Sequence, residues 1–299
     1  MRVYAAAIYT NNLAQHGNTF RSLNDVEQAT VVGIPHVLDS YHYINRQRYV
    51  DSIRRDGVKV FLDSGAFSAF SKGAVIDLPR YCDYINRNSD IFEVVSVLDG
   101  IGDPELTWKN QQAMHAAGVN ALPCFHFGEP LEYLDHYVEN YEYITLGGMV
   151  PISSPQLFKW LDRIWGDHLT NSDGTPKIKV HGFGLTAIPL MERYPWYSVD
   201  SSSWVQVSSN GSIMLPNRKT VGVSNNSPSR KTKGQHITTV SEAERDTITA
   251  FITSMGYDVG LLSTSYKHRW CFNIEMFNSM NTQYNGLRKT FINKTQELF

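Results

Sequence analysis

The sequence predicts an α/β fold in which eight parallel strands alternate with helices and close into a TIM-like (β/α)8 barrel. Short, continuously apolar runs such as VKVFLD and FEVVSVLD are typical of strands buried on both faces. Helical patterns separate these runs, which implies right-handed crossovers and a parallel sheet. Seven such runs within about 200 residues favour a closed barrel over an open sheet.

Seven strands and two connecting helices can be assigned in order. Residues 104–117 are expected to be helical, because Asp103 is a suitable N-cap, Pro104 fits the first turn and Gly118 ends the pattern. A second helix is expected over Gln156–Trp165. No run identifies the eighth strand. The predicted strands are Val3–Tyr9, Lys59–Asp63, Glu93–Asp99, Asn120–Phe125, Tyr143–Leu146, Lys179–Phe183 and Trp196–Asp200.

The composition changes after the last predicted strand. Residues 201–240 are rich in Ser, Asn, Gly and Lys and are predicted to form a basic nucleic-acid-binding insertion, with a hairpin around Asn210-Gly211. Residues 241–299 are predicted to be a helical C-terminal part. Its first helix begins at a capping box formed by Ser241 and Glu244 and ends near Met255. We expect residues 1–299 to form a single barrel domain with these two additions.

Composition excludes several classes of protein. Hydrophobic residues make up 42% of the 299 residues and charged residues 19%, which excludes global disorder. Apolar runs fall short of the ~18 residues that cross a bilayer, so no membrane association is expected. The N-terminal apolar run fits a buried strand better than a signal peptide. Three cysteines, odd in number and far apart, indicate a reducing compartment and no disulfide framework.

The net charge of −2 conceals an asymmetry. Residues 1–200 carry 16 basic and 23 acidic side chains, whereas residues 201–299 carry 11 basic and 6 acidic ones. Residues 201–240 contain no Asp or Glu. Such a block contacts a polyanion or forms a solvated loop, and both interpretations stay open. Its candidate nucleic-acid-binding residues are Arg218, Lys219, Arg230, Lys231 and Lys233.

Three carboxylates fall at predicted strand ends. Asp63, Asp99 and Asp200 each end an apolar run and precede small residues. In a parallel barrel the catalytic groups lie at the carboxyl ends of the strands. One such Asp is more often the N-cap of the next helix, but three on one barrel face favour chemistry at least as much. Paired carboxylates are characteristic of glycosyl transfer.

Glycine and histidine residues support a site at the same face. Gly147-Gly148 follows the run YITL and would expose backbone N–H groups to a ligand, or would simply form a tight turn. His126 and His181 are candidates for substrate contact, with a structural role as the alternative.

These motifs, in this order, resemble the tRNA-guanine transglycosylase superfamily over roughly residues 55–204. The family's Asp-Ser-Gly-Gly-Phe strand end corresponds to DSGAF at 63–67. Its later base-reading Asp corresponds to Asp99, its Gly-Gly-Leu strand end to Gly147-Gly148-Met149, and its nucleophilic Asp to Asp200.

The chain departs from the tRNA enzymes of that family in its C-terminal part. Those enzymes carry a zinc site of closely spaced cysteines and a histidine, whereas this chain has only Cys271 after Asp200. The glutamine that helps hold the base has no clear counterpart, and His126 lies near its place. The short, zinc-free chain is most similar to the phage DNA-guanine transglycosylases. That resemblance implies a phage-encoded enzyme of the infected cell's cytoplasm that protects DNA from restriction.

The resemblance also implies a mechanism and a set of site residues. DNA and a 7-deazaguanine base, such as 7-cyano-7-deazaguanine, would be the partners, and no metal or organic cofactor is expected. Asp200 would be the nucleophile and Asp63 the general acid and base. The remaining substrate-binding residues would be Ser64, Phe67, Asp99, His126, Gly147, Gly148, Met149 and His181.

Other functions fit part of the pattern. The same exchange on tRNA is the nearest alternative. A barrel N-glycosidase would release guanine without replacing it, and a non-catalytic nucleic-acid-binding barrel would use the three Asp residues only as caps. A metal-dependent hydrolase is disfavoured, because no pair of residues has the spacing HxH or HExxH. The sequence leaves the oligomeric state open.

Overall fold

The computed structural model describes residues 1–185, 187–217, 219–285 and 289–291 and divides into two compact units. The first unit comprises Met1–Thr10, His36–Ser201 and Tyr284–Phe299, and the second comprises Asn11–Pro35 and Ser202–Gln283. In the described ranges no helix is long and apolar enough to cross a lipid bilayer.

The first unit contains the predicted parallel barrel. Its strands follow the order β4-β3-β2-β1-β8-β7-β6-β5, and all neighbours are parallel. A parallel bridge between Ser96 and Leu122 joins the β4 and β5 edges, so the sheet curls into a ring. The strands are β1 (Arg2–Ala6), β2 (Val37–Ser40), β3 (Val60–Asp63), β4 (Phe92–Val95), β5 (Cys124–His126), β6 (Tyr143–Gly147), β7 (Lys179–Gly182) and β8 (Ser198–Ser201).

The strand that the sequence pattern does not reveal is β2. It has only four residues, VLDS, and the last two are polar. Gly33, Pro35 and His36 interrupt the apolar residues before β2, so no continuous apolar run marks this strand. Its Ser40 and Asp39 lie toward the carboxyl end of the barrel, where polar residues replace apolar ones.

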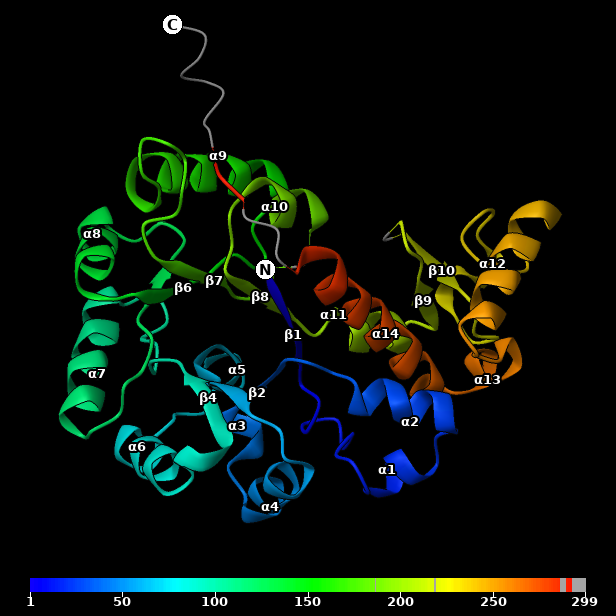
Figure 1. Ribbon diagram of the computed structural model, residues 1–299, viewed down its shortest axis with the longest axis horizontal. Helices are drawn as coiled ribbons and strands as arrows, with labels where there is room; N and C mark the ends of the chain where they lie inside the picture. Colours follow the sequence, from blue (N-terminus) through cyan, green and yellow to red (C-terminus); the bar gives the residue numbers. More distant parts are fainter. Residues whose placement is uncertain (186, 218, 286–288, 292–299) are drawn as a thin grey trace, which may run out of the picture. The chain divides into compact units, whose positions relative to one another are not determined.

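Helices surround the barrel, as Figure 1 shows for α4, α6, α7, α8 and α9. The predicted helix at 104–117 is α7, whose N-cap Asp103 accepts a hydrogen bond from the Leu106 amide. The predicted second helix is α9, which buries Leu157, Leu161 and Ile164 along one face. Helices of this unit are α3 (Tyr41–Ile44), α4 (Gln47–Asp56), α5 (Ala66–Ser71), α6 (Leu78–Arg87), α7 (Pro104–Ala116), α8 (Leu131–Asn140), α9 (Ser154–Ile164) and α10 (Ile188–Arg193). Short helical turns follow α6 at Ser89–Ile91 and α9 at Trp165–Leu169.

Aromatic rings fill the barrel interior. Tyr4 and Phe61 pack edge to face with their centroids 5.5 Å apart. The His181 ring lies 4.7 Å from both Phe61 and Phe183, and it is fully buried. Successive side chains of a strand alternate between its two faces, so the residue two positions after an interior apolar residue also faces the interior. This alternation brings Asp63, two residues after Phe61, to the barrel mouth.

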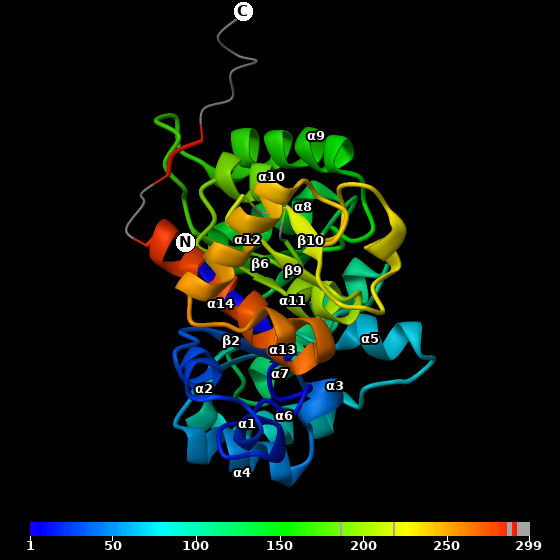
Figure 2. The same cartoon turned by 90° about the vertical axis from the view of Figure 1, so that its right-hand side faces the viewer.

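The second unit combines helices with one antiparallel hairpin. Figure 2 shows α12, α13 and α14 grouped around β9 and β10. The predicted helix from Ser241 is α12, where the Ser241 hydroxyl accepts a hydrogen bond from the Glu244 amide. Elements of this unit are α1 (Asn18–Arg21), α2 (Asp25–Val32), α11 (Ser203–Ser209), β9 (Ser212–Met214), β10 (Thr220–Gly222), the 3-10 helix Pro228–Lys231, α12 (Glu242–Ser254), α13 (Val259–Thr264) and α14 (Tyr266–Tyr284), whose last residue belongs to the first unit.

The predicted hairpin around Asn210-Gly211 is wrong. Residues 203–209 form helix α11, because Trp204 and Ser208 lie one turn apart and are both buried in the unit, where Trp204 packs against Trp270. Asn210 is the C-cap of this helix, and Gly211 follows with a φ of +75°. The dipeptide therefore ends a helix rather than joining two strands. The hairpin of this region is formed by β9 and β10 instead.

Candidate functional site

Asp63 ends β3 at the carboxyl face of the barrel. The β2–β3 register sets Ser40 beside it, and the Ser40 hydroxyl donates a hydrogen bond to Asp63 Oδ2 at 2.6 Å. The Gly65 amide donates to the same oxygen at 3.1 Å. Gly65 has a φ of +75°, and a Cβ there would lie 2.6 Å from His42 Cβ. The turn that presents Asp63 therefore requires glycine.

The environment of Asp63 favours its protonated form. Burial raises the pKa of this carboxyl to about 7, the Ser40 hydrogen bond opposes the increase, and the charges of Asp99 and Asp200 add to it. The contribution of both charges places the three carboxyl groups within electrostatic reach of one another. An acid with a pKa near 7 can both donate and accept a proton at neutral pH.

Asp200 lies in β8 and is only 7% exposed. Its Oδ1 accepts a hydrogen bond from the Gly184 amide at 2.8 Å and lies 3.3 Å from His181 Nε2. The β7–β8 register pairs His181 with Ser198, and the Ser198 hydroxyl lies 2.7 Å from His181 Nδ1. Both ring nitrogens of His181 are thus engaged, and the ring fixes Asp200 in position.

Asp99 and His126 meet at the mouth of the barrel from neighbouring strands. His126 Nε2 lies 3.7 Å from Asp99 Oδ2 and 3.5 Å from Cys124 Sγ, while Nδ1 lies 3.0 Å from Glu129 Oε1. Burial opposes protonation of His126, but the Cys124 sulfur and the Asp99 and Glu129 carboxylates outweigh it and raise the pKa of the imidazole. Burial, assisted by the Asp99 charge, raises the pKa of the Cys124 thiol to about 11.

Gly147 and Gly148 form the turn after β6. The β5–β6 register pairs His126 with Gly147, and a Cβ on Gly147 would lie 2.8 Å from His126 Cδ2. The absence of that atom lets the imidazole lie against the backbone. Gly148 has a φ of +68°, and Met149 is 3% exposed. The predicted pair of glycines is therefore needed for close packing and for the turn.

Two predicted substrate-binding residues occupy contrasting positions. Ser64 is fully buried, where its amide donates to the Ser96 hydroxyl at 3.1 Å and its own hydroxyl accepts a hydrogen bond from the Ala66 amide at 3.3 Å. These contacts engage Ser64 in the β3–α5 turn. Phe67 lies in α5 and is 60% exposed, so its ring is available to a ligand.

Sequence reasoning missed four polar residues at this face. Ser40 follows the unrecognised strand, and Cys124 and Glu129 flank His126 in the sequence. The spacing Cys124-Phe125-His126 was a usable signal, because residues two apart on a strand share one face. The fourth residue, Asp39, is structural: its carboxylate accepts hydrogen bonds from the Tyr9 amide at 2.8 Å and from the Thr10 hydroxyl at 2.6 Å.

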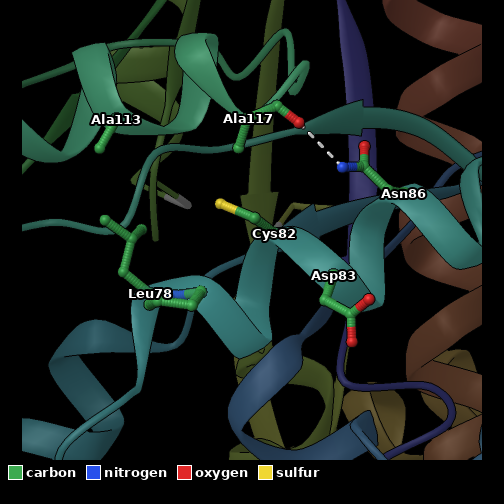
Figure 3. Close-up of a pocket in the computed structure, with 7 residues that line it drawn as sticks. Leu78, Cys82, Asp83, Asn86, Ala113 and Ala117 are labelled. Atoms are coloured by element: carbon green, nitrogen blue, oxygen red, sulfur yellow. Dashed lines mark hydrogen bonds between the residues drawn. The ribbon is translucent and has the colours of Figure 1, made fainter.

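A hollow of about 370 Å³ lies elsewhere, between α6 and α7 on the outside of the barrel (Figure 3). Asn86 on its rim donates a hydrogen bond to the Ala117 carbonyl at 3.0 Å. Apart from Cys82, Asp83 and Asn86, its lining consists of Leu78, Pro79, Ala113 and Ala117. This hollow lacks the convergent polar groups of the barrel mouth, so we place the candidate site at the strand ends.

The basic residues belong to the second unit. Lys219, Arg230, Lys231 and Lys233 are exposed, and Arg218 lies outside the described residues. Their segment is folded: the Ser227 hydroxyl accepts a hydrogen bond from the Ser229 amide and donates one to the Asn210 carbonyl at 2.9 Å. Exposed cations of this kind can contact an anionic partner.

Comparison with models of known protein families and with curated proteins finds no match to this chain. The chemistry of the barrel mouth is therefore the basis for a functional inference. The barrel mouth combines three carboxyl groups. The pKa of Asp63 is raised to about 7, Asp200 is held by the Gly184 amide and the His181 imidazole, and Asp99 lies beside the His126 imidazole. This set is suited to proton transfer coupled to attack by a carboxylate.

Proposed function

We propose that this protein is a transglycosylase that exchanges guanine in DNA for a 7-deazaguanine, such as 7-cyano-7-deazaguanine, through a covalent glycosyl–aspartate intermediate. The observation that carries the proposal is that Asp63, Asp99 and Asp200 lie at one barrel mouth and that the pKa of Asp63 is raised to about 7. One carboxyl group that acts as acid and base and a second that acts as nucleophile are what glycosyl transfer with a covalent intermediate requires.

The first half of the reaction breaks the bond between C1′ and the base. The Asp200 carboxylate attacks C1′ and forms an ester bond, while the electrons of the C1′–N9 bond leave with guanine. The protonated Asp63 carboxyl donates its proton to the departing base. Both contacts to Asp200 involve Oδ1, so we assign Oδ2 to the attack.

The second half reverses these events with a different base. The Asp63 carboxylate removes the N9 proton of the incoming 7-deazaguanine, whose nitrogen then attacks C1′ and releases Asp200. Asp63 thus returns to its protonated form, and Asp200 to its charged form. A pKa of about 7 for Asp63 suits both halves, because neither protonation state is strongly disfavoured at neutral pH.

The base would be recognised by groups around Asp99. A guanine presents N1–H and the N2 amino group on one edge, and a carboxylate is their natural acceptor. The oxygen Asp99 Oδ1 is buried, and no described residue forms a hydrogen bond with it. Guanine and 7-deazaguanine share this edge, so one pocket serves both bases. Backbone N–H groups of the Gly148-Met149 turn would contact O6, and Phe67 would stack on the ring.

The nucleic acid would contact the second unit through its basic segment. A base inside a duplex is not accessible to attack at C1′ in this way, so a flipped or single-stranded guanine is expected. Exposed Lys and Arg side chains neutralise phosphates and release counterions, which gives salt-dependent binding. The positive balance of residues 201–299, with 11 basic against 6 acidic side chains, supports this role.

A base-exchange assay tests the proposal. The full chain is incubated with 7-cyano-7-deazaguanine and either guanine-containing DNA or tRNA, and the digested nucleosides are analysed by mass spectrometry. We expect the modified deoxynucleoside from DNA. Modification of tRNA alone would contradict the choice of substrate, and guanine release without replacement would indicate an N-glycosidase. If neither product forms, the protein would be a non-catalytic nucleic-acid-binding barrel, and the catalytic assignments would lose their basis.

Variants connect the activity to the site. Asp200→Ala removes the nucleophile and should abolish exchange, while Asp51→Asn, an exposed carboxylate of α4, should leave exchange unchanged. Undiminished exchange by Asp200→Ala would overturn the assignment of the nucleophile.

A further inference from the structure

Three different metal-ligand types converge at the ends of β4 and β5. Asp99, Cys124 and His126 place one ligand atom each within 4.8 Å of the others. Cys124 and His126 are two residues apart on β5 and therefore share its inner face. Asp99 follows β4, whose continuation is paired with the start of β5 through Ser96 and Leu122.

The spacing of these atoms matches a tetrahedral zinc site. Zinc binds a thiolate at about 2.3 Å and an imidazole nitrogen at about 2.0–2.1 Å, which separates sulfur from nitrogen by roughly 3.6 Å at a tetrahedral angle. The distance between Cys124 Sγ and His126 Nε2 is 3.5 Å. The distance between His126 Nε2 and Asp99 Oδ2 is 3.7 Å, so a small movement of the carboxylate completes the site.

Two further observations indicate a ligand rather than ordinary packing. Asp99 Oδ1 is buried, and the described part of the chain offers it no hydrogen-bond partner. A cation bound to this carboxylate would compensate that buried oxygen. The other nitrogen of His126, Nδ1, lies 3.0 Å from Glu129 Oε1. A carboxylate on the far side of a ligating imidazole fixes the ring and its tautomer, as in most histidine metal sites.

We propose that Asp99, Cys124 and His126 form a binding site for a borderline-soft divalent cation of the zinc type, with Glu129 as the positioning residue for His126. Such a cation displaces the thiol proton of Cys124 and the proton on His126 Nε2 to solvent, and it forms bonds to the sulfur and the nitrogen. Three protein ligands leave a fourth coordination position open, as in zinc sites that also bind an exogenous ligand.

This site goes beyond the proposed function, which needs no metal. The base exchange and the cation would share Asp99, so a bound cation would compete with the base for that carboxylate. Metal binding can be measured without nucleic acid or base. Failure of the metal site and failure of the transglycosylase proposal are therefore separate results.

Cobalt and zinc titrations test the proposal on the full chain. The chain is treated with a chelator and then titrated with Co²⁺, whose thiolate complexes show a sulfur-to-cobalt charge-transfer absorption. We expect one equivalent of Co²⁺ with this absorption, and its displacement by one equivalent of Zn²⁺. Absence of stoichiometric binding, or binding without the thiolate absorption, would overturn the site.

Matched variants identify the ligands. Cys124→Ser should abolish the charge-transfer absorption, whereas Cys82→Ser, a buried cysteine of α6, should retain it. Glu129→Gln should retain the absorption but weaken Zn²⁺ binding about 10–100-fold, the range found for partners of ligating histidines. This variant keeps the test decisive if Cys124→Ser does not fold. Persistence of the absorption in a folded Cys124→Ser, or unchanged affinity in Glu129→Gln, would contradict the proposal.

Discussion

At the scale of residues, strand register explains most contacts of the candidate site. Ser40 faces Asp63, His126 faces Gly147 and His181 faces Ser198 because these residues are paired across neighbouring strands. Each pair brings a polar group to the barrel mouth from a different strand. The site is therefore held by the backbone ladder of the barrel, which is more rigid than a set of loops.

Replacing Asp63 should remove both the acid and its pH dependence. The first half of the proposed exchange requires Asp63 to be protonated, and burial raises the pKa of Asp63 to about 7. Guanine release by the wild-type chain should therefore slow as the pH rises through about 7. Asp63→Asn should lower the rate of guanine release about 10²–10⁴-fold and abolish this decrease at alkaline pH. The rate of guanine release measured over a series of pH values checks this prediction, with Asp51→Asn as the control. If the rate of Asp63→Asn still falls at alkaline pH, Asp63 is not the acid.

Ser40 offers a subtler test of the same carboxyl group. Its hydroxyl donates to Asp63 Oδ2 at 2.6 Å and favours the charged form. Ser40→Ala should therefore raise the pKa of Asp63 further, and the fall in the rate of guanine release at alkaline pH should move to higher pH. Ser40→Thr keeps the hydroxyl and should restore the wild-type profile. If the fall in rate moves to lower pH in Ser40→Ala, or does not move, this hydrogen bond does not lower the pKa of Asp63.

The sequence alone indicates the three acids and the histidines beside two of them, but not the other polar partners. Asp63, Asp99 and Asp200 stand out because each interrupts an apolar run. Ser40, which donates to Asp63, and Glu129, which contacts His126, have no such signal, because one ends a four-residue strand and the other lies in a loop. Partner identity depends on which strands become neighbours, and that is a property of the closed sheet.

At the scale of elements, apolar runs predict most barrel strands and mislead at one point. The alternation in WVQV resembles a strand, yet residues 203–209 form α11 because Trp204 and Ser208 share a buried helical face. Four residues fit both periods equally well, so only tertiary packing decides between them. Strand β2 is missed for another reason: only two of its residues are apolar, and Pro35 and His36 directly precede them.

Gly211 tests the end of α11. Its φ is +75°, and a Cβ there would lie 2.7 Å from Ser224 Cβ. Gly211→Ala should therefore add a steric clash to the backbone strain of about 1–2 kcal/mol. Gly234→Ala is the matched control, because its φ is +73° and nothing lies within 4 Å of the added atom.

Chemical denaturation of the two variants measures the difference. The free energy of unfolding should fall more in Gly211→Ala than in Gly234→Ala. Equal losses would indicate that the glycine serves only the backbone conformation and that the packing of the following segment against α11 is loose.

At the scale of the whole molecule, the chemistry and the positive charge are divided between the two units. The candidate chemistry lies entirely in the first unit, and the exposed cations Lys219, Arg230, Lys231 and Lys233 lie in the second. Charge counts along the sequence predict the basic segment at residues 201–240. They do not predict that residues 11–35 belong with residues 202–283, because no composition change marks that segment.

Salt dependence measures the contribution of the basic segment. Each neutralised phosphate changes the slope of log K against log salt by about 0.9 for duplex DNA and about 0.7 for single strands. The double variant Lys231→Ala/Lys233→Ala should therefore reduce the slope by roughly 1.8 or 1.4. Lys109→Ala, an exposed lysine of α7, should leave the slope unchanged. Fluorescence anisotropy with a labelled oligonucleotide checks it, and a slope unaffected by the double variant would remove the basic segment from the binding surface.

The bond between Asp200 and C1′ is the defining step of the proposed mechanism, and trapping that bond is its most direct test. The full chain is mixed with a guanine-containing oligonucleotide in the absence of an incoming base, quenched under denaturing conditions and weighed intact by mass spectrometry. We predict a protein whose mass increases by that of the oligonucleotide less one guanine, with the modification mapped to Asp200 and absent in Asp200→Ala. Base exchange under the same conditions without any such adduct, or an adduct on another residue, would contradict the account.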